Sequence, residues 1–174
     1  MSFTQKWSRW ALFNFVVLAL VGVLLRYKIL YPLPLVDHKH LLHAHSHFAF
    51  AGWVSQFIMI LMVYTLKSKI PLESLLKYEK IFIVNLVVAY LMLISFLYQG
   101  YGLFSITLST LSLFISYWFA YWFYQDLKIT PNSFYSKNWF KAALLFLVAS
   151  SVGTFCLAYM MATKNLPQDF YLGS

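Results

Sequence analysis

The chain has 174 residues, of which 61% are hydrophobic, 21% aromatic and only 10% charged. Soluble domains average about 45–50% apolar and about 25% charged residues, so this composition excludes an ordinary soluble domain and indicates an integral membrane protein. The formal net charge of +8 does not indicate a nucleic-acid partner, because the Lys and Arg residues lie between long apolar runs and form no stripe on a soluble fold.

Five segments are long and apolar enough to be predicted as membrane-spanning helices. In chain order they are residues 10–31, 41–66, 80–97, 103–124 and 139–161. An isolated strand would leave its backbone groups unpaired in lipid, so we expect an all-α bundle that forms a single transmembrane domain over residues 1–174. The first segment lacks an A-x-A-like cleavage site and runs into Arg26 and Lys28, so we expect it to be retained rather than cleaved as a signal peptide.

The Lys and Arg residues divide unequally between the two sides of the predicted bundle. Nine of the 13 collect on the side of the N-terminus: Lys6, Arg9, Lys67, Lys69, Lys77, Lys80, Lys128, Lys137 and Lys141. The other side has Arg26, Lys28, Lys39 and Lys164. Because cytoplasmic loops carry the excess of positive charge, we expect a cytoplasmic N-terminus, an outward C-terminus and a multi-pass location in a bacterial inner membrane.

The stretch from residue 37 to 52, DHKHLLHAHSHFAFAG, holds all five histidines of the chain. Asp37 is a predicted N-cap of the second helix, so the histidines are expected at the outer mouth of that helix. An ionisable side chain at membrane depth is costly and is a functional candidate by default. The deeper His43, His45 and His47 therefore indicate a cofactor site.

Helical geometry splits the histidines between two faces. At about 100° per residue, His40, His43 and His47 share one stripe, whereas His38 and His45 lie on the opposite one. The His43/His47 pair has the i, i+4 spacing that can hold one metal ion, and His40 could add a third ligand. This pattern favours copper or zinc as one possible cofactor, with His45 as a further candidate ligand.

Haem is the other candidate cofactor, since each face can present one imidazole to a flat ligand. Phe50 and Trp53, with small residues around them, would form an apolar wall that a planar group can approach closely. Arg26 and Lys28 lie on the same predicted side and could pair with haem propionates, although snorkelling to lipid headgroups is the more ordinary explanation of both.

Isolated polar residues inside the predicted spans are expected to hydrogen-bond between helices. They are Asn14, Ser55, Gln56, Asn85 and Ser95.

Residues 42–52, LHAHSHFAFAG, resemble the second transmembrane helix of haem-copper oxidase catalytic subunits. They are also similar to the His-x-His signature of the membrane haem proteins associated with nitric oxide response. The resemblance implies a b-type haem near the outer mouth, with His43 as its axial ligand or, in the His-Ala-His register, His45. It covers only this stretch, and because no histidine lies outside the second helix it does not imply a complete oxidase.

A low-spin haem needs two axial ligands, and one protomer could supply both only if another residue reached the iron, such as Met92, Met160 or Tyr98. A homo-oligomer or a partner membrane subunit could bring it instead. The leading hypothesis is therefore a small membrane haem protein for electron transfer or diatomic gas binding. The alternatives are a copper or zinc protein, such as an assembly factor for a respiratory complex, and a structural subunit of a membrane complex; whether the chain is an enzyme stays open.

Overall fold

The computed structural model describes residues 3–34, 36–131 and 136–163, without the side chains at positions 157, 158 and 160–163. Its elements in chain order are α1 (Phe3–Leu30), α2 (His38–Phe48), η1 (Ala49–Ser55), α3 (Gln56–Leu66), α4 (Leu72–Gln99), α5 (Leu103–Ile129) and α6 (Lys137–Thr163). None of the described residues forms a strand, so the all-α prediction is confirmed for this part of the chain.

Five helices of the described chain are long and apolar enough to cross a membrane, as the hydropathy predicted. The second runs from His38 to Leu66 through α2, η1 and α3. The third begins at Leu72, whereas the sequence predicted residue 80. The added turns are amphipathic, because they bury Ser74 and Tyr78 while their charged side chains stay at least partly exposed.

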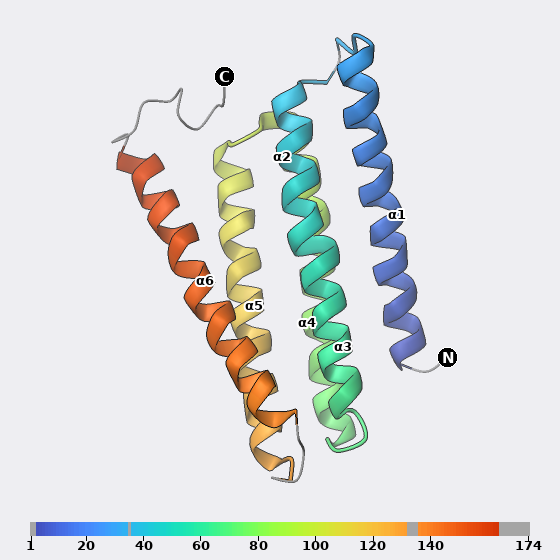
Figure 1. Cartoon of the computed structure of the whole chain (residues 1–174), viewed down its shortest axis with the longest axis vertical. Helices are drawn as coiled ribbons and strands as arrows, with labels where there is room; N and C mark the ends of the chain where they lie inside the picture. The colour runs from blue at the N-terminus through green and yellow to red at the C-terminus, as the bar shows by residue number, and fades with distance from the viewer. Residues whose placement is uncertain (1–2, 35, 132–135, 164–174) are drawn as a thin grey trace. The chain divides into compact units, whose positions relative to one another are not determined.

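The chain divides into two compact units, Met1–Thr130 and Pro131–Ser174, and each is described by itself. In the first unit α2 lies between α1 and α4, and α5 packs against α4 (Figure 1). The second unit contains α6. The prediction of a single transmembrane domain stays a prediction.

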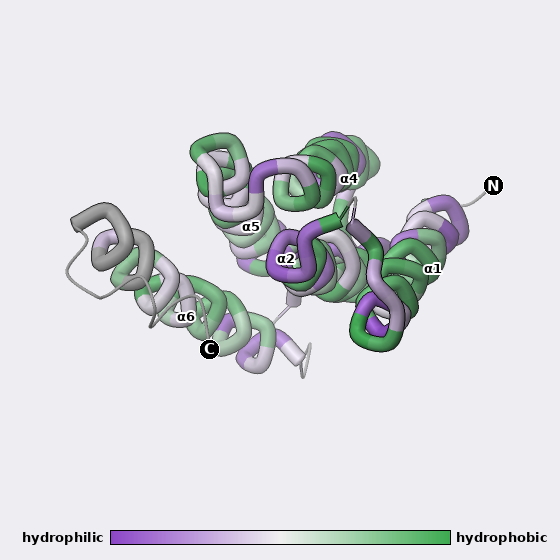
Figure 2. The backbone as a smooth tube through the Cα atoms, turned by 90° about the horizontal axis from the view of Figure 1, so that it is seen from above, coloured by the Kyte–Doolittle hydropathy of each residue, from purple (hydrophilic) through white to green (hydrophobic). Residues whose placement is uncertain are grey.

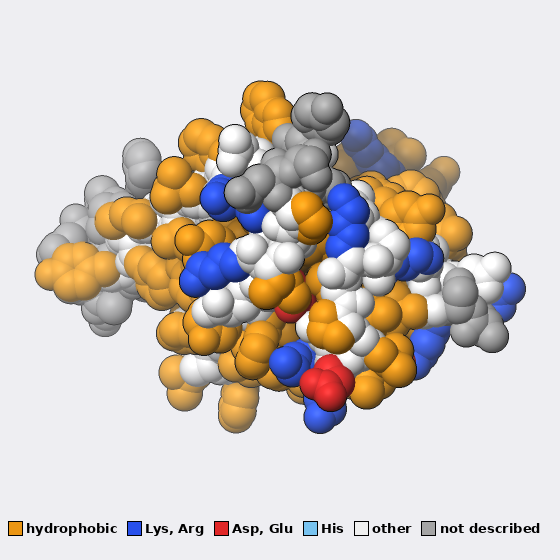
Figure 3. Space-filling view, turned by 90° about the horizontal axis from the view of Figure 1, so that it is seen from below, with side chains coloured by type: hydrophobic (Ala, Val, Ile, Leu, Met, Phe, Trp, Pro, Cys, Tyr) orange, Lys and Arg blue, Asp and Glu red, His pale blue; other side chains and the backbone are white. Residues whose placement is uncertain are grey.

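The two ends of the first unit differ in the chemistry of their side chains. The end at which α1 finishes and α2 begins carries the histidines, and we call it the histidine end. Figure 2 looks onto this end and shows the first turns of α2 as hydrophilic among largely apolar helices. The opposite end, the lysine end, gathers Lys and Arg side chains (Figure 3). There Lys6 of α1 forms an ion pair with Glu79 of α4.

Below the first histidines, α2 packs its apolar side against α1 and α4. The buried cluster includes Leu18 of α1, Ala44 and Phe48 of α2, and Met92 with Phe96 of α4. Ala44 and Phe48 are fully buried. If lipid surrounds these helices it is as apolar as the side chains themselves, so close packing rather than exclusion of water holds the contact together.

The central span contains a π-helix that the sequence analysis missed. A continuous α-helix was expected over residues 41–66, but Ala49–Ser55 is π-helical. Two of its carbonyls accept hydrogen bonds from neighbouring helices: Asn14 of α1 donates to Gly52 O at 2.6 Å and Asn85 of α4 to Ala51 O at 3.0 Å. Both asparagines are buried, and a buried amide without a partner costs about 1–3 kcal/mol. The π-helix therefore lies where two helices supply donors for its carbonyls.

A buried carboxylate joins α4 and α5 near the lysine end. Asp126 of α5 accepts hydrogen bonds from the Ser74 hydroxyl at 3.0 Å and from the Tyr78 hydroxyl at 2.6 Å. Asp126 is only 8% exposed. The sequence analysis did not single out this residue, because its partners lie far away in the chain and form no local motif.

Replacement of Asp126 by alanine should lower the free energy of unfolding in detergent by about 1–3 kcal/mol, because two buried hydroxyls lose their acceptor. Denaturant unfolding followed by circular dichroism measures the change. Asp126→Asn keeps one acceptor oxygen and should lose less. Glu73→Ala, an exposed acid in the first turn of α4, is the matched control and should cost at most about 1 kcal/mol. An Asp126→Ala variant no less stable than this control would contradict the assignment.

Candidate functional site

The predicted N-cap at the start of α2 is confirmed. The His40 backbone N–H donates to Asp37 Oδ1 at 3.0 Å, and Asp37 has the extended backbone of an N-cap residue. This hydrogen bond holds the pKa of the Asp37 carboxyl below its ordinary value. The cap fixes where the helix starts and hence how the histidines are distributed around it.

The histidines of α2 divide between two flanks of the helix, as the helical period predicts. His40, His43 and His47 lie toward the connection between α4 and α5, and we call this side the turn flank. His45 lies toward Gly22 of α1, on what we call the α1 flank. His38 is exposed at the mouth of the helix.

His47 is enclosed by side chains of α4, α5 and the turn between them. Its Nε2 lies 3.2 Å from the Tyr101 hydroxyl, and its Nδ1 lies 3.4 Å from the Ser109 hydroxyl. The imidazole stacks on the Phe96 ring with centroids 4.2 Å apart. Both ring nitrogens thus have partners within the protein, which leaves His47 poorly placed to bind a ligand.

Tyr101 contacts two of the three histidines of the turn flank. Its ring meets His43 edge-on with centroids 4.4 Å apart, and it meets His47 at 5.8 Å. Among the described residues, no group of three or more His, Cys, Asp or Glu side chains is placed to hold a metal ion. The candidate copper or zinc ligands His40, His43 and His47 therefore share a flank without gathering around one point, and His45 lies away from them.

Gly100 brings the α4–α5 turn against the start of α2. It has a φ of +56°, and a Cβ added there would lie 2.5 Å from His40 Cδ2. Both the backbone conformation and the close contact require glycine. His40 is thereby packed against the turn. The next residue of the turn, Tyr101, is partly buried, and this burial raises the pKa of its phenol.

His45 has a different environment on the α1 flank. Its Nδ1 is buried and has no hydrogen-bond partner among the residues that the structure describes. The ring lies against Gly22, where an added Cβ would be 3.1 Å from His45 Cε1. Gly22 therefore lets α1 approach the imidazole, and a larger side chain there would push the ring away.

The α1 flank extends along α1 on both sides of this contact. Arg26 follows Gly22 by one helical turn toward the histidine end and is exposed. In the other direction, Phe15 contacts Trp53 of η1 with ring centroids 4.9 Å apart. Trp53, which the sequence placed in the cofactor wall, thus meets the same helix as His45.

The remaining predicted cofactor residues lie elsewhere. Phe50 is 70% exposed, and Lys28 donates to a backbone carbonyl of the α1–α2 connection at 2.7 Å. Of the candidates for a second axial ligand, Met92 is buried in the core and Tyr98 is 86% exposed. The side chain of Met160 lies outside the described residues.

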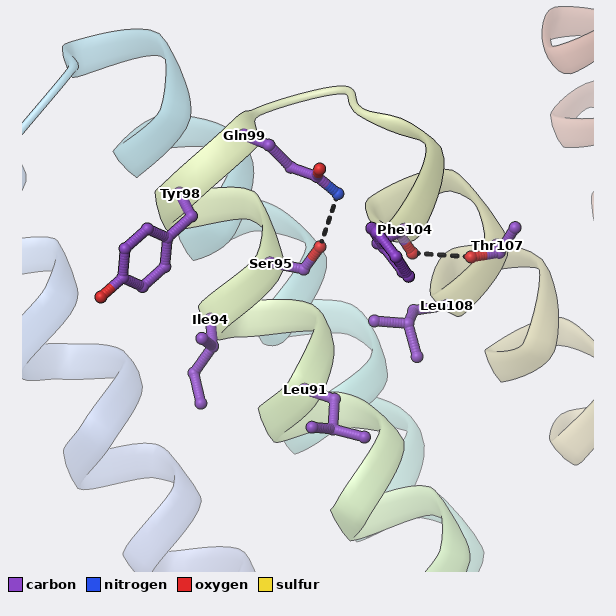
Figure 4. A pocket seen from close by; sticks show the side chains of 8 residues that line it. All are labelled: Leu91, Ile94, Ser95, Tyr98, Gln99, Phe104, Thr107 and Leu108. Atoms are coloured by element: carbon purple, nitrogen blue, oxygen red, sulfur yellow. Dashed lines mark hydrogen bonds between the residues drawn. The ribbon is translucent and has the colours of Figure 1, made fainter.

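A shallow groove between α4 and α5 near the histidine end is distinct from the histidine flanks (Figure 4). It has a volume of about 440 Å³ and is lined by Leu91, Ile94, Ser95, Tyr98, Gln99, Phe104, Thr107 and Leu108. The lining is mainly apolar, and the Gln99 amide pairs with the Ser95 hydroxyl at 3.0 Å. No histidine borders this groove, so it adds nothing to the candidate cofactor site.

Comparison with protein-family models, with curated proteins and with solved structures finds no match for the chain. The assignment of a site therefore depends on the residues and geometry of the two histidine flanks.

Replacement of Tyr101 tests the packing of the turn flank. Burial raises the pKa of this phenol. The protonated phenol therefore contributes its full share to the free energy of unfolding below the ordinary phenol pKa, and this share is lost as the pH rises through the raised pKa. In an alkaline titration followed by tyrosinate absorbance, Tyr101→Phe should remove a component that titrates above the ordinary tyrosine range. Tyr98→Phe, in the last turn of α4, is the control for the loss of one phenol. Removal of only an ordinary component by Tyr101→Phe would contradict the burial.

Proposed function

We propose that this chain is a multi-pass membrane protein that binds b-type haem on its α1 flank, with His45 as an axial ligand. The observation that carries the proposal is the buried Nδ1 of His45, which has no hydrogen-bond partner in the described part of the chain. Buried polar atoms in proteins are nearly always paired, and each exception calls for an explanation such as water, an ion or a ligand. The concentration of all five histidines at one helix end supports a ligand.

The residues around His45 fit a planar, anionic cofactor. Gly22 lets the imidazole pack directly against α1, and Phe15 with Trp53 provides aromatic surface deeper in the helices. In this assignment His45 would hold the iron, Trp53 would contact the ring, and Arg26 would pair with a propionate. Bound haem supplies a redox-active iron that suits electron transfer or diatomic gas binding.

His43 is the alternative ligand, and the resemblance to haem-copper oxidase subunits implies it by motif position. Two contacts favour His45 over the turn flank: the ring of His43 packs against Tyr101, and both nitrogens of His47 are already hydrogen-bonded. The second axial ligand would come from a second copy of this chain or from a partner membrane subunit, because α2 carries every histidine.

We also propose that the lysine end faces the cytoplasm of a bacterial cell and that the histidine end faces outward. The excess of Lys and Arg at the lysine end supports this orientation, because positively charged loops stay on the cytoplasmic side. The haem would then lie close to the outer surface of the inner membrane.

The test of the haem proposal is the absorption spectrum of purified protein, oxidised and reduced, after expression with ample haem. We expect a stoichiometric Soret band with sharp reduced α and β bands. His45→Gly should abolish these bands, and added imidazole should restore them by occupying the space of the missing ring. His38→Gly makes the same backbone change at an exposed position of the same helix and should keep the spectrum.

Three other results would redirect the proposal. Loss of the bands in His43→Gly but not in His45→Gly would move the ligand to the turn flank. A featureless wild-type spectrum would overturn haem binding. Copper or zinc found by metal analysis of that colourless sample would favour the metal-protein alternative instead.

Single cysteines test the orientation. In a Cys156→Ser background, His38→Cys at the histidine end should react with a membrane-impermeant maleimide added to spheroplasts. Lys69→Cys at the lysine end should react only after the cells are lysed. Both native residues are exposed, so a difference in labelling reports sidedness rather than burial. The reverse labelling pattern would show that the orientation is inverted.

A further inference from the structure

We infer that the π-helix η1 sets the rotational position of the histidines and that Asn14 and Asn85 hold it in place. This inference deepens the haem proposal and rests on it for the role of His45. The placement of the histidines by η1, however, is a property of the protein alone and can be measured without a cofactor.

The position of η1 between α2 and α3 determines how the two α-helices are rotated relative to each other. Successive residues of an α-helix lie about 100° apart, and a π-helical turn absorbs one additional residue. If α3 were instead extended toward the N-terminus as a continuous α-helix, each place now occupied by a residue of α2 would be occupied by the next residue of the chain. In that continuous helix, Ser46 would take the place toward α1 that His45 occupies.

The same displacement would empty the turn flank of histidines. In a continuous α-helix, Phe48 would take the place of His47 beside Tyr101, and His45 would turn into the place of Ala44. Ala44 is fully buried between helices, so an imidazole there would be forced into the packed core. The π-helix thus keeps His45 out of the packed core and distributes the histidines over the two flanks of α2.

Asn14 holds one carbonyl of η1 from the side of α1. Its Nδ2 donates to Gly52 O at 2.6 Å, and its Oδ1 accepts from the Tyr90 hydroxyl at 2.9 Å, which fixes the orientation of the amide. A Cβ at Gly52 would lie 2.7 Å from the Phe48 ring, so glycine also permits the packing above this carbonyl.

Asn85 holds the adjacent carbonyl from the side of α4. Its Nδ2 donates to Ala51 O at 3.0 Å and to Gln56 Oε1 at 2.7 Å. In a continuous α-helix both carbonyls would accept the backbone N–H four residues further on. The amides of Asn14 and Asn85 would then have to share each carbonyl with that backbone N–H, so the two asparagines favour the π-helical conformation.

A cross-linking experiment measures directly which residue of α2 faces Gly22 of α1. In a Cys156→Ser background, Gly22→Cys is combined either with His45→Cys or with Ser46→Cys and His45→Ala, so that no imidazole crowds the new cysteine in either pair. A short bis-maleimide, which bridges two thiols, is then added. With η1 intact, the His45→Cys pair should cross-link in higher yield than the Ser46→Cys pair.

Removal of the two amides should reverse this preference. Asn14→Leu and Asn85→Leu together keep the side-chain size but cannot donate to the carbonyls, so the Ser46→Cys pair should become the more reactive. Deletion of Phe50, an exposed residue of η1, should restore the His45→Cys preference in this background, because a continuous α-helix then places His45 toward α1 again. Val87→Leu, at an exposed position of α4, leaves both donors and their partners intact and is the control that should keep the wild-type preference.

An unchanged preference for His45→Cys in the double-asparagine variant would overturn the inference, and so would failure of the Phe50 deletion to restore it. The spectrum separates this inference from the haem proposal. If haem binds, the double-asparagine variant should lose its Soret band and the Phe50 deletion should regain it. Reversal of the cross-link in a protein that never shows a Soret band would support the positioning by η1 and overturn haem binding.

Discussion

Polar groups inside these apolar helices must find their partners within the protein, and this requirement organises the first unit. The hydrocarbon core of a bilayer offers no water to pair with a free carbonyl or carboxylate. Side-chain amides of α1 and α4 donate hydrogen bonds to two backbone carbonyls of η1. Two hydroxyls of α4 donate to the Asp126 carboxylate of α5. The helices are therefore joined at two levels along their length by hydrogen bonds between buried polar groups.

The same requirement gives the two histidine flanks different characters. On the turn flank, Tyr101 and Ser109 pair with both nitrogens of His47, so this imidazole contributes to the packing between helices. On the α1 flank, His45 keeps a buried nitrogen that no described residue pairs with. The resemblance to a haem-binding helix favours some histidine of α2, and the difference between the flanks is the reason that we select His45.

Features that depend on composition and helical period could be predicted from the sequence. Hydropathy located the long apolar helices, Asp37 marked the start of α2, and the period of 3.6 residues separated the histidine faces. Features that depend on contacts between helices could not. Isolated amides such as Asn14 and Asn85 indicated hydrogen bonds between helices, but nothing local shows that their acceptors are carbonyls of a π-helix, because an apolar run fits either helix equally well. The partners of Asp126 were missed for the same reason.

The contact between Gly100 and His40 bears on the order in which the helices assemble. The second helix precedes the fourth and fifth in the chain, so its first turn is already synthesised when their connection is made. That connection fits against the His40 ring so closely that a methyl group on Gly100 would collide with it. A larger residue at position 100 would have to displace this ring, so the packing of the later hairpin against the first turn of α2 depends on glycine there, whether or not a cofactor ever binds.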